Sequence, residues 1–345
     1  MAYVRNENLE NITVKLLQNW GVPTGQAEVI ADTIVYAHRH EKHTHGITRM
    51  SIYQRKIESG LMSKETVVSK ITDLGSITVL DCNDGFGQVA AYEAMKNSIH
   101  KAGAMGMAAT FVRNSNNFGV AGYFGEMATK EGMVGIVLTS SGPAVAPPGG
   151  TKSIFGTNPV CFAFPTEKGN IILDMAISEA ARGKIRLAQK NGEKIPLGWA
   201  VDSQGNPTDD PEKALQGNML AIGGIKGFGL AMVNDIMAGL LSGSAFGGDI
   251  KPLGYGGGPS RHGHVLIAID ISKLMDINEY YVKIDKLIKN VKSCGESGKI
   301  FMPGERSAEY AKKNETKVDL KINLIEEYNQ LTAKFGIKEK LEVIK

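Results

Sequence analysis

The 345-residue sequence has little cysteine, little net charge and no long apolar run. Its three cysteines are far apart and lack CxxC spacing, which argues against a disulfide framework or a cysteine zinc site and fits a reducing compartment. The formal net charge of +3 does not by itself imply a nucleic-acid or membrane partner. No apolar run approaches about 18 residues, and the first residues lack a signal-peptide core. We therefore expect a soluble cytoplasmic protein.

The common nucleotide-binding motifs are also missing. Gly85-Phe86-Gly87 and Gly227-Phe228-Gly229 offer G-x-G without the third glycine of the dinucleotide fingerprint, and no P-loop occurs. The stretch Gly223–Gly227 includes Lys226 and precedes an expected helix, so its amides could wrap a phosphate. An ordinary glycine turn is the competing interpretation.

Histidine is concentrated in one place. His38, His40, His43 and His45 lie within eight residues, and the absence of an H-E-x-x-H pattern favours a polar helix end over a metal site. Arg49 follows His45 by four residues. A proton donor beside a guanidinium suits a 2-oxo acid, because arginine can clamp the carboxylate while histidine protonates the carbonyl oxygen. An ordinary surface arginine is the alternative.

Hydrophobic spacing divides the chain into helical ends and a middle where strands alternate with helices, which predicts an α/β core with a largely buried sheet. Polar connectors near residues 61–70 and 290–297 are candidate domain boundaries. We expect a mainly helical domain of residues 1–70 with 296–345, and an α/β cofactor-binding domain of residues 71–295. The expected strands are 76–81, 107–112, 134–139, 160–164, 171–173 and 264–270, and the expected helices are 9–20, 24–38, 52–60, 88–102, 122–131, 177–190, 228–242 and 317–335.

Two polar positions follow expected strands. The loop Asn114–Gly119 lies between a strand and a helix, at the edge where ligands bind in open α/β folds. An asparagine-rich capping loop is the alternative. Asp174 ends an apolar strand, where a carboxylate can orient a histidine, bind a ribose hydroxyl or cap the next helix.

In order and spacing, these segments resemble the type-2 malate/L-lactate dehydrogenase family, whose fold is unrelated to the Rossmann dehydrogenases. This family also contains ureidoglycolate and sulfolactate dehydrogenases and cyclic imino-acid reductases. The resemblance covers roughly residues 7 to 335. The matching motifs are His45-Gly46-Ile47-Thr48-Arg49, Arg113-Asn114-Ser115 with Phe118-Gly119, Gly156-Thr157-Asn158-Pro159, Leu173-Asp174-Met175-Ala176, Ala181-Arg182-Gly183-Lys184-Ile185, Ile195-Pro196 with Gly198-Trp199-Ala200, Gly223-Gly224 with Lys226-Gly227, and Pro303-Gly304-Glu305-Arg306.

The resemblance implies a mixed central sheet with flanking helices, a non-Rossmann NAD(P) site and an obligate homodimer with active sites near the interface. It makes His45 the acid/base candidate and Arg49 the carboxylate binder, with Thr44 and Tyr53 on the substrate side. Asp174 would orient the histidine or touch the nicotinamide ribose. The implied cofactor-contacting residues are Ser140, Asp174, Met175, Ala176, Lys226, Gly227, Gly304, Glu305 and Arg306.

Two departures from the family pattern bear on catalysis. His43 stands where an aspartate is common, and Asn117 stands where some members have a loop histidine that accepts the proton. An asparagine hydrogen-bonds but takes no proton at neutral pH. Either His45 carries the proton transfer alone, as a charged donor in the reducing direction, or activity is lowered.

We therefore expect an oxidoreductase that interconverts a small 2-hydroxy acid and its 2-oxo acid. The expected cofactor is NAD, with NADP as the alternative, and the expected substrate pair is malate and oxaloacetate. The alternatives are ureidoglycolate, lactate, sulfolactate or a cyclic imine as substrate, or a nicotinamide-binding protein of weak activity because of Asn117. A zinc protein using His38, His40 and His43 is a third alternative. We expect a homodimer with no metal, nucleic-acid or membrane partner.

Overall fold

The computed structural model describes residues 2–252, 257–296 and 298–344. The helices are α1 (Asn6–Asn19), α2 (Thr24–Arg39), α3 (Met50–Glu58), α4 (Gly87–Met105), α5 (Ala121–Lys130), α6 (Arg182–Asn191), α7 (Pro211–Gln216), α8 (Ile225–Asn234), α9 (Ile277–Lys292), α10 (Glu305–Lys313) and α11 (Ile322–Lys334). The strands are β1 (Ala2–Arg5), β2 (Ser69–Leu74), β3 (Ile77–Asp81), β4 (Met107–Ser115), β5 (Met133–Thr139), β6 (Val160–Phe164), β7 (Ile171–Met175), β8 (Ala200–Val201), β9 (Asn218–Met219), β10 (His262–Asp270), β11 (Lys317–Leu320) and β12 (Val343–Ile344). Short helical turns are η1 (His43–His45), η2 (Ile47–Arg49), η3 (Asp235–Leu240) and η4 (Ile271–Lys273).

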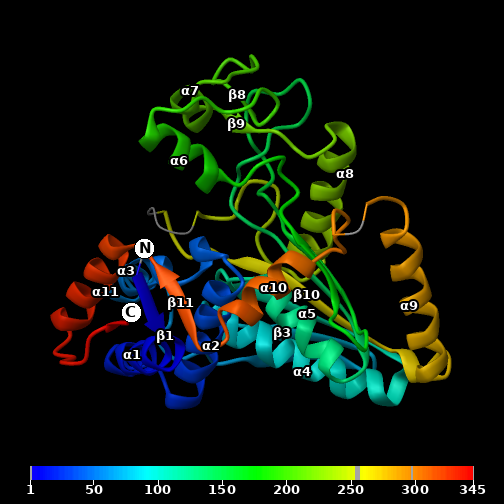
Figure 1. Ribbon diagram of the computed structural model, residues 1–345. Helices are drawn as coiled ribbons and strands as arrows, with labels where there is room; N and C mark the ends of the chain where they lie inside the picture. The colour runs from blue at the N-terminus through cyan, green and yellow to red at the C-terminus, as the bar shows by residue number, and fades with distance from the viewer. Residues whose placement is uncertain (1, 253–256, 297, 345) are drawn as a thin grey trace.

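A seven-stranded mixed sheet lies at the centre of the fold, in the order β2-β3-β4-β10-β5-β6-β7 (Figure 1). Only β3 and β4 pair in parallel, and the other neighbours are antiparallel. The middle strand β10 is apolar and mostly buried, because helices α4 and α5 pack on one face of the sheet and η3 packs against its central strands. The predicted mixed sheet with flanking helices is confirmed, and it differs from the parallel Rossmann sheet.

The two ends of the chain meet in a second sheet, in which β1 pairs with both β11 and β12. Beside it, side chains of α1, α2 and α3 share one buried core with residues of β11 and α11, among them Leu16, Ile30, Val318 and Ile325. This packing supports a helical unit built from both chain ends, although the division into two domains stays a prediction.

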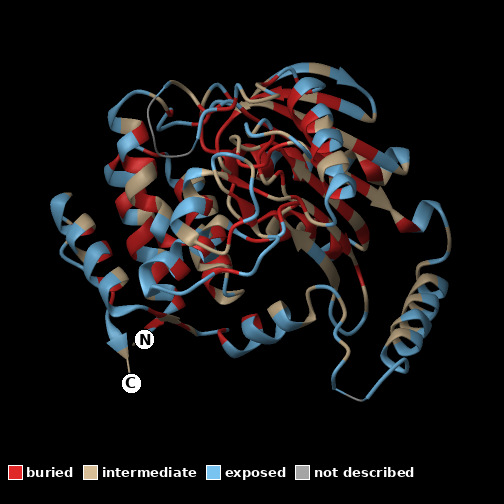
Figure 2. Cartoon of the chain, turned by 90° about the horizontal axis from the view of Figure 1, so that it is seen from above, coloured by how far each residue is buried: buried red, intermediate tan, exposed pale blue. Residues whose placement is uncertain are grey.

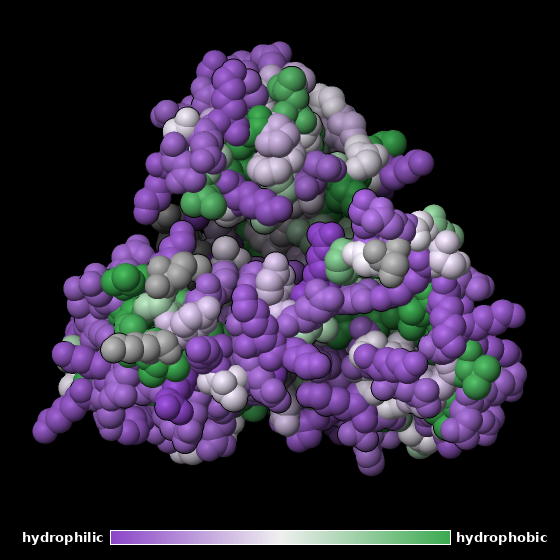
Figure 3. Space-filling model, in the orientation of Figure 1, coloured by the Kyte–Doolittle hydropathy of each residue, from purple (hydrophilic) through white to green (hydrophobic). Residues whose placement is uncertain are grey.

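A further lobe carries α6, α7 and the two-stranded sheet β8–β9, at the top of Figure 1. It has its own small core, which includes Ile185, Ile195 and Met219. Figure 2 shows the buried residues concentrated in the main sheet and its adjoining helices, whereas α9 has no buried residue. Figure 3 shows this face of the molecule divided into lobes, with a hollow where they meet.

The structure departs from the expected elements at a few segments. The helix expected at 317–335 starts at Ile322, because Lys317–Leu320 pairs with β1 as strand β11. The helix expected at 177–190 starts at Arg182, because Ser178 bridges to Ala221. Of the connector 290–297, the first three residues end α9, and residue 297 lies outside the described residues. Of the helices within the described ranges, none is both long and apolar enough to cross a membrane.

Candidate active site

The histidine run follows helix α2, and its first member is a structural residue. His38 is fully buried, and its Nε2 accepts the amide N–H of Ile47 over 3.0 Å. Its Nδ1 lies 3.1 Å from Nδ1 of His43. Burial, followed by the charge of His43, lowers the pKa of His38 to about 3, so the ring is neutral. A Cβ on Gly46 would lie 2.0 Å from Nε2 of His38, so only glycine fits there.

The other candidate zinc ligands each have one ring nitrogen, Nδ1, engaged within the protein. His40 stacks on the ring of Tyr36 with 3.8 Å between centroids, and its Nδ1 pairs with the Tyr36 carbonyl oxygen over 2.9 Å. His43 faces His38. Within the described part of the chain, no cluster of three His, Cys, Asp or Glu residues is arranged to hold a metal ion. These contacts leave little support for the zinc alternative.

His45 and Arg49 are both hydrogen-bonded to Thr44. The Arg49 Nε donates to the Thr44 carbonyl oxygen over 2.6 Å, and the Thr44 hydroxyl lies 3.1 Å from Nδ1 of His45. His45 is half-buried. Burial, then the positive charges of Arg49 and Lys42, lower the pKa of His45 to about 3. In the free protein this imidazole is therefore neutral and can act as a base, and it needs an added negative charge nearby to hold a proton.

One face of helix α3 continues from Arg49 through Tyr53 to Lys56. Tyr53 is only 1% exposed, and its hydroxyl accepts an N–H of Gln88 over 2.9 Å. Lys56 is also buried, and its ammonium donates to the side-chain oxygen of Asn116 over 3.0 Å and to the hydroxyl of Ser260. These contacts join the helix that begins beside Arg49 to the loop that carries Asn117.

The loop itself is held tightly. The Nδ2 of Asn116 donates to the carbonyl oxygens of Asp84 and Gly85, each over 2.9 Å. A Cβ on Gly87 would lie 2.1 Å from the Asn116 carbonyl oxygen, so the start of α4 abuts the loop. The Asn117 side-chain oxygen accepts the amide N–H of Gly119 over 3.2 Å. Among the described residues, its two N–H donors have no hydrogen-bond acceptor.

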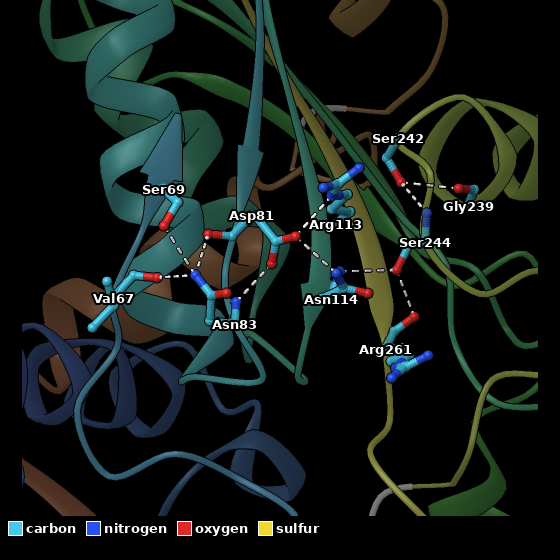
Figure 4. A network of polar contacts seen from close by, with 10 residues as sticks. All are labelled: Val67, Ser69, Asp81, Asn83, Arg113, Asn114, Gly239, Ser242, Ser244 and Arg261. Carbon is cyan, nitrogen blue, oxygen red and sulfur yellow. Dashed lines mark hydrogen bonds and ion pairs between the residues drawn. The ribbon is translucent and has the colours of Figure 1, made fainter. Parts of the chain in front are cut away.

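A polar network at the ends of β3 and β4 supports this loop from one side (Figure 4). Asp81 accepts hydrogen bonds from Arg113 over 2.8 Å and from the Asn114 side chain over 2.9 Å. Burial opposes ionisation of Asp81, but these bonds and the Asn83 amide lower its pKa overall. Asn83 and Asn114 both have positive φ, near 50°, which asparagine tolerates better than most residues. The network fixes a strained backbone just before Ser115.

The buried side chain of His264, on strand β10, supports the start of this loop. His264 is fully buried, with Nε2 2.8 Å from the Ser115 hydroxyl and Nδ1 2.7 Å from the Thr139 hydroxyl. The next residue, Ser140, is also fully buried, and its hydroxyl accepts the Gly263 amide N–H over 3.0 Å. The loop and the predicted cofactor residue Ser140 are therefore parts of one connected polar layer.

A cavity of about 870 Å³ lies beside the histidine run, and Lys42, Asp174, Gly304 and Arg306 contribute to its wall. Asp174 accepts the Gly122 amide N–H over 3.1 Å. Burial raises the pKa of Asp174, and the charge of Lys42 opposes this. The charge of Lys42 acts on both Asp174 and His45, although the sequence analysis did not identify this residue. Its position three residues before His45 was the one sequence feature that indicated it.

Two of the predicted cofactor segments meet at this cavity. Gly304 has φ +85°, and a Cβ there would lie 2.7 Å from the Ile172 carbonyl oxygen. The Ile172 amide donates to the Pro303 carbonyl oxygen over 3.0 Å. The start of α10 is therefore packed directly on β7, two residues before Asp174.

Comparison with known proteins agrees with this arrangement. The sequence profile of the malate/L-lactate dehydrogenase family matches residues 4–329. The malate/(S)-sulfolactate dehydrogenase of Methanothermus fervidus is 36% identical over 333 residues, covering 96% of this chain and 98% of the relative. The malate dehydrogenase of Pyrococcus horikoshii is 34% identical over 353 residues, covering 97% of each. The solved sulfolactate dehydrogenase of Methanocaldococcus jannaschii superposes with a TM-score of 0.93 at 33% identity, over 99% of this chain and 100% of that one.

The chain belongs to the malate/L-lactate dehydrogenase family. As a member of this family it is an oxidoreductase that acts on 2-hydroxy acids. The names of its relatives differ in the substrate they give, malate or sulfolactate, so membership alone leaves the substrate open.

The remaining predicted cofactor residues have different surroundings. The Glu305 carboxylate pairs with Lys292 and accepts the Met302 amide over 2.8 Å. The Arg306 guanidinium lies 4.2 Å from the Phe301 ring centre, at the cavity wall. Glu305 is thus paired within the protein at the start of α10, whereas Arg306 is exposed at the cavity wall.

The second glycine-rich segment begins helix α8. Gly223 and Gly224 have φ values of +58° and +62°, and a Cβ on Gly227 would lie 2.0 Å from the Ile222 carbonyl oxygen. Lys226 is exposed in the first turn of the helix. Met175 and Ala176 are half-buried and directly follow Asp174. The predicted set is therefore divided among the α10 cavity, the Ser140 layer and the start of α8.

Proposed function

We propose that the protein interconverts oxaloacetate and malate with a nicotinamide dinucleotide. NAD is the proposed cofactor, and NADP is the alternative. The observation that carries this proposal is that His45 and Arg49 share Thr44 as a hydrogen-bonding partner. This holds an acid/base group beside a carboxylate-binding guanidinium, as reduction of a 2-oxo acid requires.

The cavity beside Asp174 supports binding of the cofactor. Its volume of about 870 Å³ falls within the range of about 300–1,000 Å³ that is usual for ligand sites. Asp174 would hold a ribose hydroxyl, and Arg306 would face a phosphate. The close approach of Gly304 to Ile172 leaves no room for a side chain at this wall. When bound, the reduced nicotinamide supplies the hydride that reaches C2 of the substrate.

Arg49 would bind the C1 carboxylate of the substrate through paired hydrogen bonds. Burial is the main cause of the lowered pKa of His45, and the charges of Arg49 and Lys42 add to it. The added negative charge offsets these two charges and so favours uptake of a proton by the imidazole in the complex. In the reducing direction His45 gives this proton to the oxygen on C2, and in the oxidising direction the neutral ring accepts it. The N–H donors of Asn117 would hydrogen-bond the same oxygen and position it.

A non-catalytic nicotinamide-binding protein is the second candidate, and Asn117 is the observation that favours it. Lactate, sulfolactate, ureidoglycolate and cyclic imines are the competing substrates.

The three cysteines, Cys82, Cys161 and Cys294, are free thiols, which supports a reducing compartment such as the cytoplasm.

We also propose that the protein is a homodimer. Helix α8 and the turn η3 present large exposed apolar side chains, including Ile225 at 67%, Leu230 at 55% and Val233 at 56%. Such a surface is typical of a protein interface. Because Lys226 and Gly227 begin this helix, a second copy seated there would lie next to these two predicted cofactor residues.

A spectrophotometric screen of oxaloacetate, pyruvate, sulfopyruvate and oxalurate with NADH and NADPH tests the proposal. We expect turnover with oxaloacetate, and a kcat about 10²–10⁴-fold lower in His45→Ala. Near-normal turnover in this variant would remove His45 from the mechanism. Binding of NADH without turnover of any substrate would favour the second candidate.

A further inference from the structure

Helix α6 of the upper lobe lies directly over the turn that carries Thr44. A Cβ on Gly183 would lie 3.3 Å from the Cγ2 of Thr44, so this face of α6 touches the proposed substrate site. Arg186 follows Gly183 by three residues and therefore lies on the same face of the helix, about one turn on. Its side chain is exposed.

The positive charge of Arg186 acts on Arg49. Burial lowers the pKa of Arg49; Tyr53 opposes this shift, and the charge of Arg186 adds to it. Among the ion pairs within residues 2–252, 257–296 and 298–344, none includes either arginine. Two cations that repel one another across a site are stabilised together by an anion between them.

The other cations at the start of α6 have partners within their own lobe. The Nη2 of Arg182 donates to the Leu215 carbonyl oxygen over 3.1 Å. The ammonium of Lys184 lies 5.9 Å from the ring centre of Trp199. Arg186 is therefore the cation of this helix that is best placed to reach a ligand at Thr44.

We propose that Arg186 binds a second anionic group of the substrate, carried on C3, while Arg49 binds the C1 carboxylate. This assignment rests on the proposed function and narrows its substrate class. A 2-oxo acid with a carboxylate or a sulfonate on C3 places two negative charges between the two guanidiniums, whereas a 2-oxo acid with an alkyl C3 leaves Arg186 without a partner. Arg186 therefore determines specificity and takes no part in proton transfer.

The test is a comparison of substrates across variants of one position. Wild type, Arg186→Leu and Arg186→Lys are assayed with oxaloacetate, sulfopyruvate and 2-oxobutyrate at saturating cofactor. Lys190→Gln is the matched control, because it removes one positive charge about 6 Å further along α6. Thermal unfolding verifies that each variant is folded.

We expect Arg186→Leu to lower kcat/KM for the two dianionic substrates about 10- to 100-fold, mainly through KM, as loss of a charged hydrogen bond does. The value for 2-oxobutyrate stays unchanged, Arg186→Lys is intermediate, and Lys190→Gln resembles wild type. A larger loss with oxaloacetate than with sulfopyruvate identifies the carboxylate as the preferred group, and the reverse identifies the sulfonate. An equal loss, or none, for all three substrates overturns the role of Arg186.

A binding measurement separates this role from the proposed function. Malate and 2-hydroxybutyrate are titrated calorimetrically into wild type and Arg186→Leu without cofactor. Weaker binding of malate alone in the variant supports Arg186 even if no substrate is turned over. Equal malate affinity in both proteins overturns the role of Arg186 even if 2-oxo acids are reduced.

Discussion

The buried ammonium of Lys56 donates to the side-chain oxygen of Asn116 over 3.0 Å and thereby ties helix α3 to the loop that carries Asn117. Burial lowers the pKa of Lys56 to about 8, and the charge of Asp84 opposes this shift. Lys56→Met removes the donor and leaves the Asn116 oxygen and the Ser260 hydroxyl without it. We expect a loss of about 1–3 kcal/mol in unfolding free energy, measured in urea. Arg55→Met, an exposed change on the same helix, is the control, and equal stability of the two variants would refute the coupling.

The buried histidines predict a loss of stability in acid. Burial holds the pKa of His38 and His262 at about 3 and that of His264 at about 4, all below the ordinary 6.5. As pH falls below 6.5 the unfolded chain binds protons that the folded chain cannot, so stability is present above that pH and lost below it. Each histidine contributes a slope of about 1.4 kcal/mol per pH unit.

This slope can be measured from urea unfolding between pH 7.5 and 4.5. His38→Gln keeps an acceptor for the Ile47 amide but does not titrate, so it should remove about one proton from the slope. The exposed His100→Gln is the matched control. A flat profile in the parent protein would show that these rings are protonated in the fold.

Gly46 is predicted to be intolerant of any side chain. A Cβ there overlaps Nε2 of His38, so Gly46→Ala must displace either that buried ring or the turn that bears His45. We expect a stability loss of about 1–3 kcal/mol together with a fall in kcat. A Cβ on Gly25 of α2 would meet no other group within 4 Å, so Gly25→Ala should be neutral or stabilising by about 0.4–1 kcal/mol. Comparable behaviour of the two variants would contradict the overlap.

Asn117 offers a gain-of-function experiment. In Asn117→His, Nδ1 can accept the Gly119 amide in place of the asparagine oxygen, which leaves Nε2 available to the substrate. If the loop faces the substrate, the profile of kcat/KM against pH should acquire an additional ionisation in the range of histidine. A profile identical in shape to that of wild type would place residue 117 outside the reacting centre.

The exposed apolar face of α8 predicts a homodimer that a single charged substitution in this face dissociates into monomers. Leu230→Glu and Val233→Glu each put a carboxylate on an exposed apolar surface of the isolated chain. Burying that charge at an interface without a partner costs several kcal/mol, so sedimentation should detect monomers. Leu274→Glu, at a position 73% exposed elsewhere, is the control. If the wild-type protein sediments as a monomer, the homodimer proposal fails.

The main sheet was predictable because most of its strands carry the apolar pattern of a buried strand in their own residues. An apolar run such as 134–139 has few alternatives to a buried strand, and β5 spans Met133–Thr139. Strand β11 was missed because Lys317–Leu320 is extended only through its pairing with β1 at the far end of the chain. Local spacing cannot report such a partner.

The site residues also fall into two groups: those that sequence spacing indicates and those that only tertiary packing identifies. His45 and Arg49 are near neighbours in sequence, so their spacing indicated a common location. Lys56 gains its significance from Asn116, 60 residues later, and Arg186 from a helix that folds back over Thr44. A lysine or arginine on an amphipathic helix is normally a solvated side chain, and only tertiary packing distinguishes these two.

Strand β1 pairs with two strands from the far end of this sequence. During translation, Ala2–Arg5 emerges from the ribosome more than 300 residues before the partners of its two edges, so the strand is exposed while the central sheet is completed. The N-terminal helices consequently acquire their full core only after β11 and α11 have been synthesised. Removal of the final strand and α11 should therefore yield a nascent chain that chaperones retain, although every proposed substrate-binding residue has already been made.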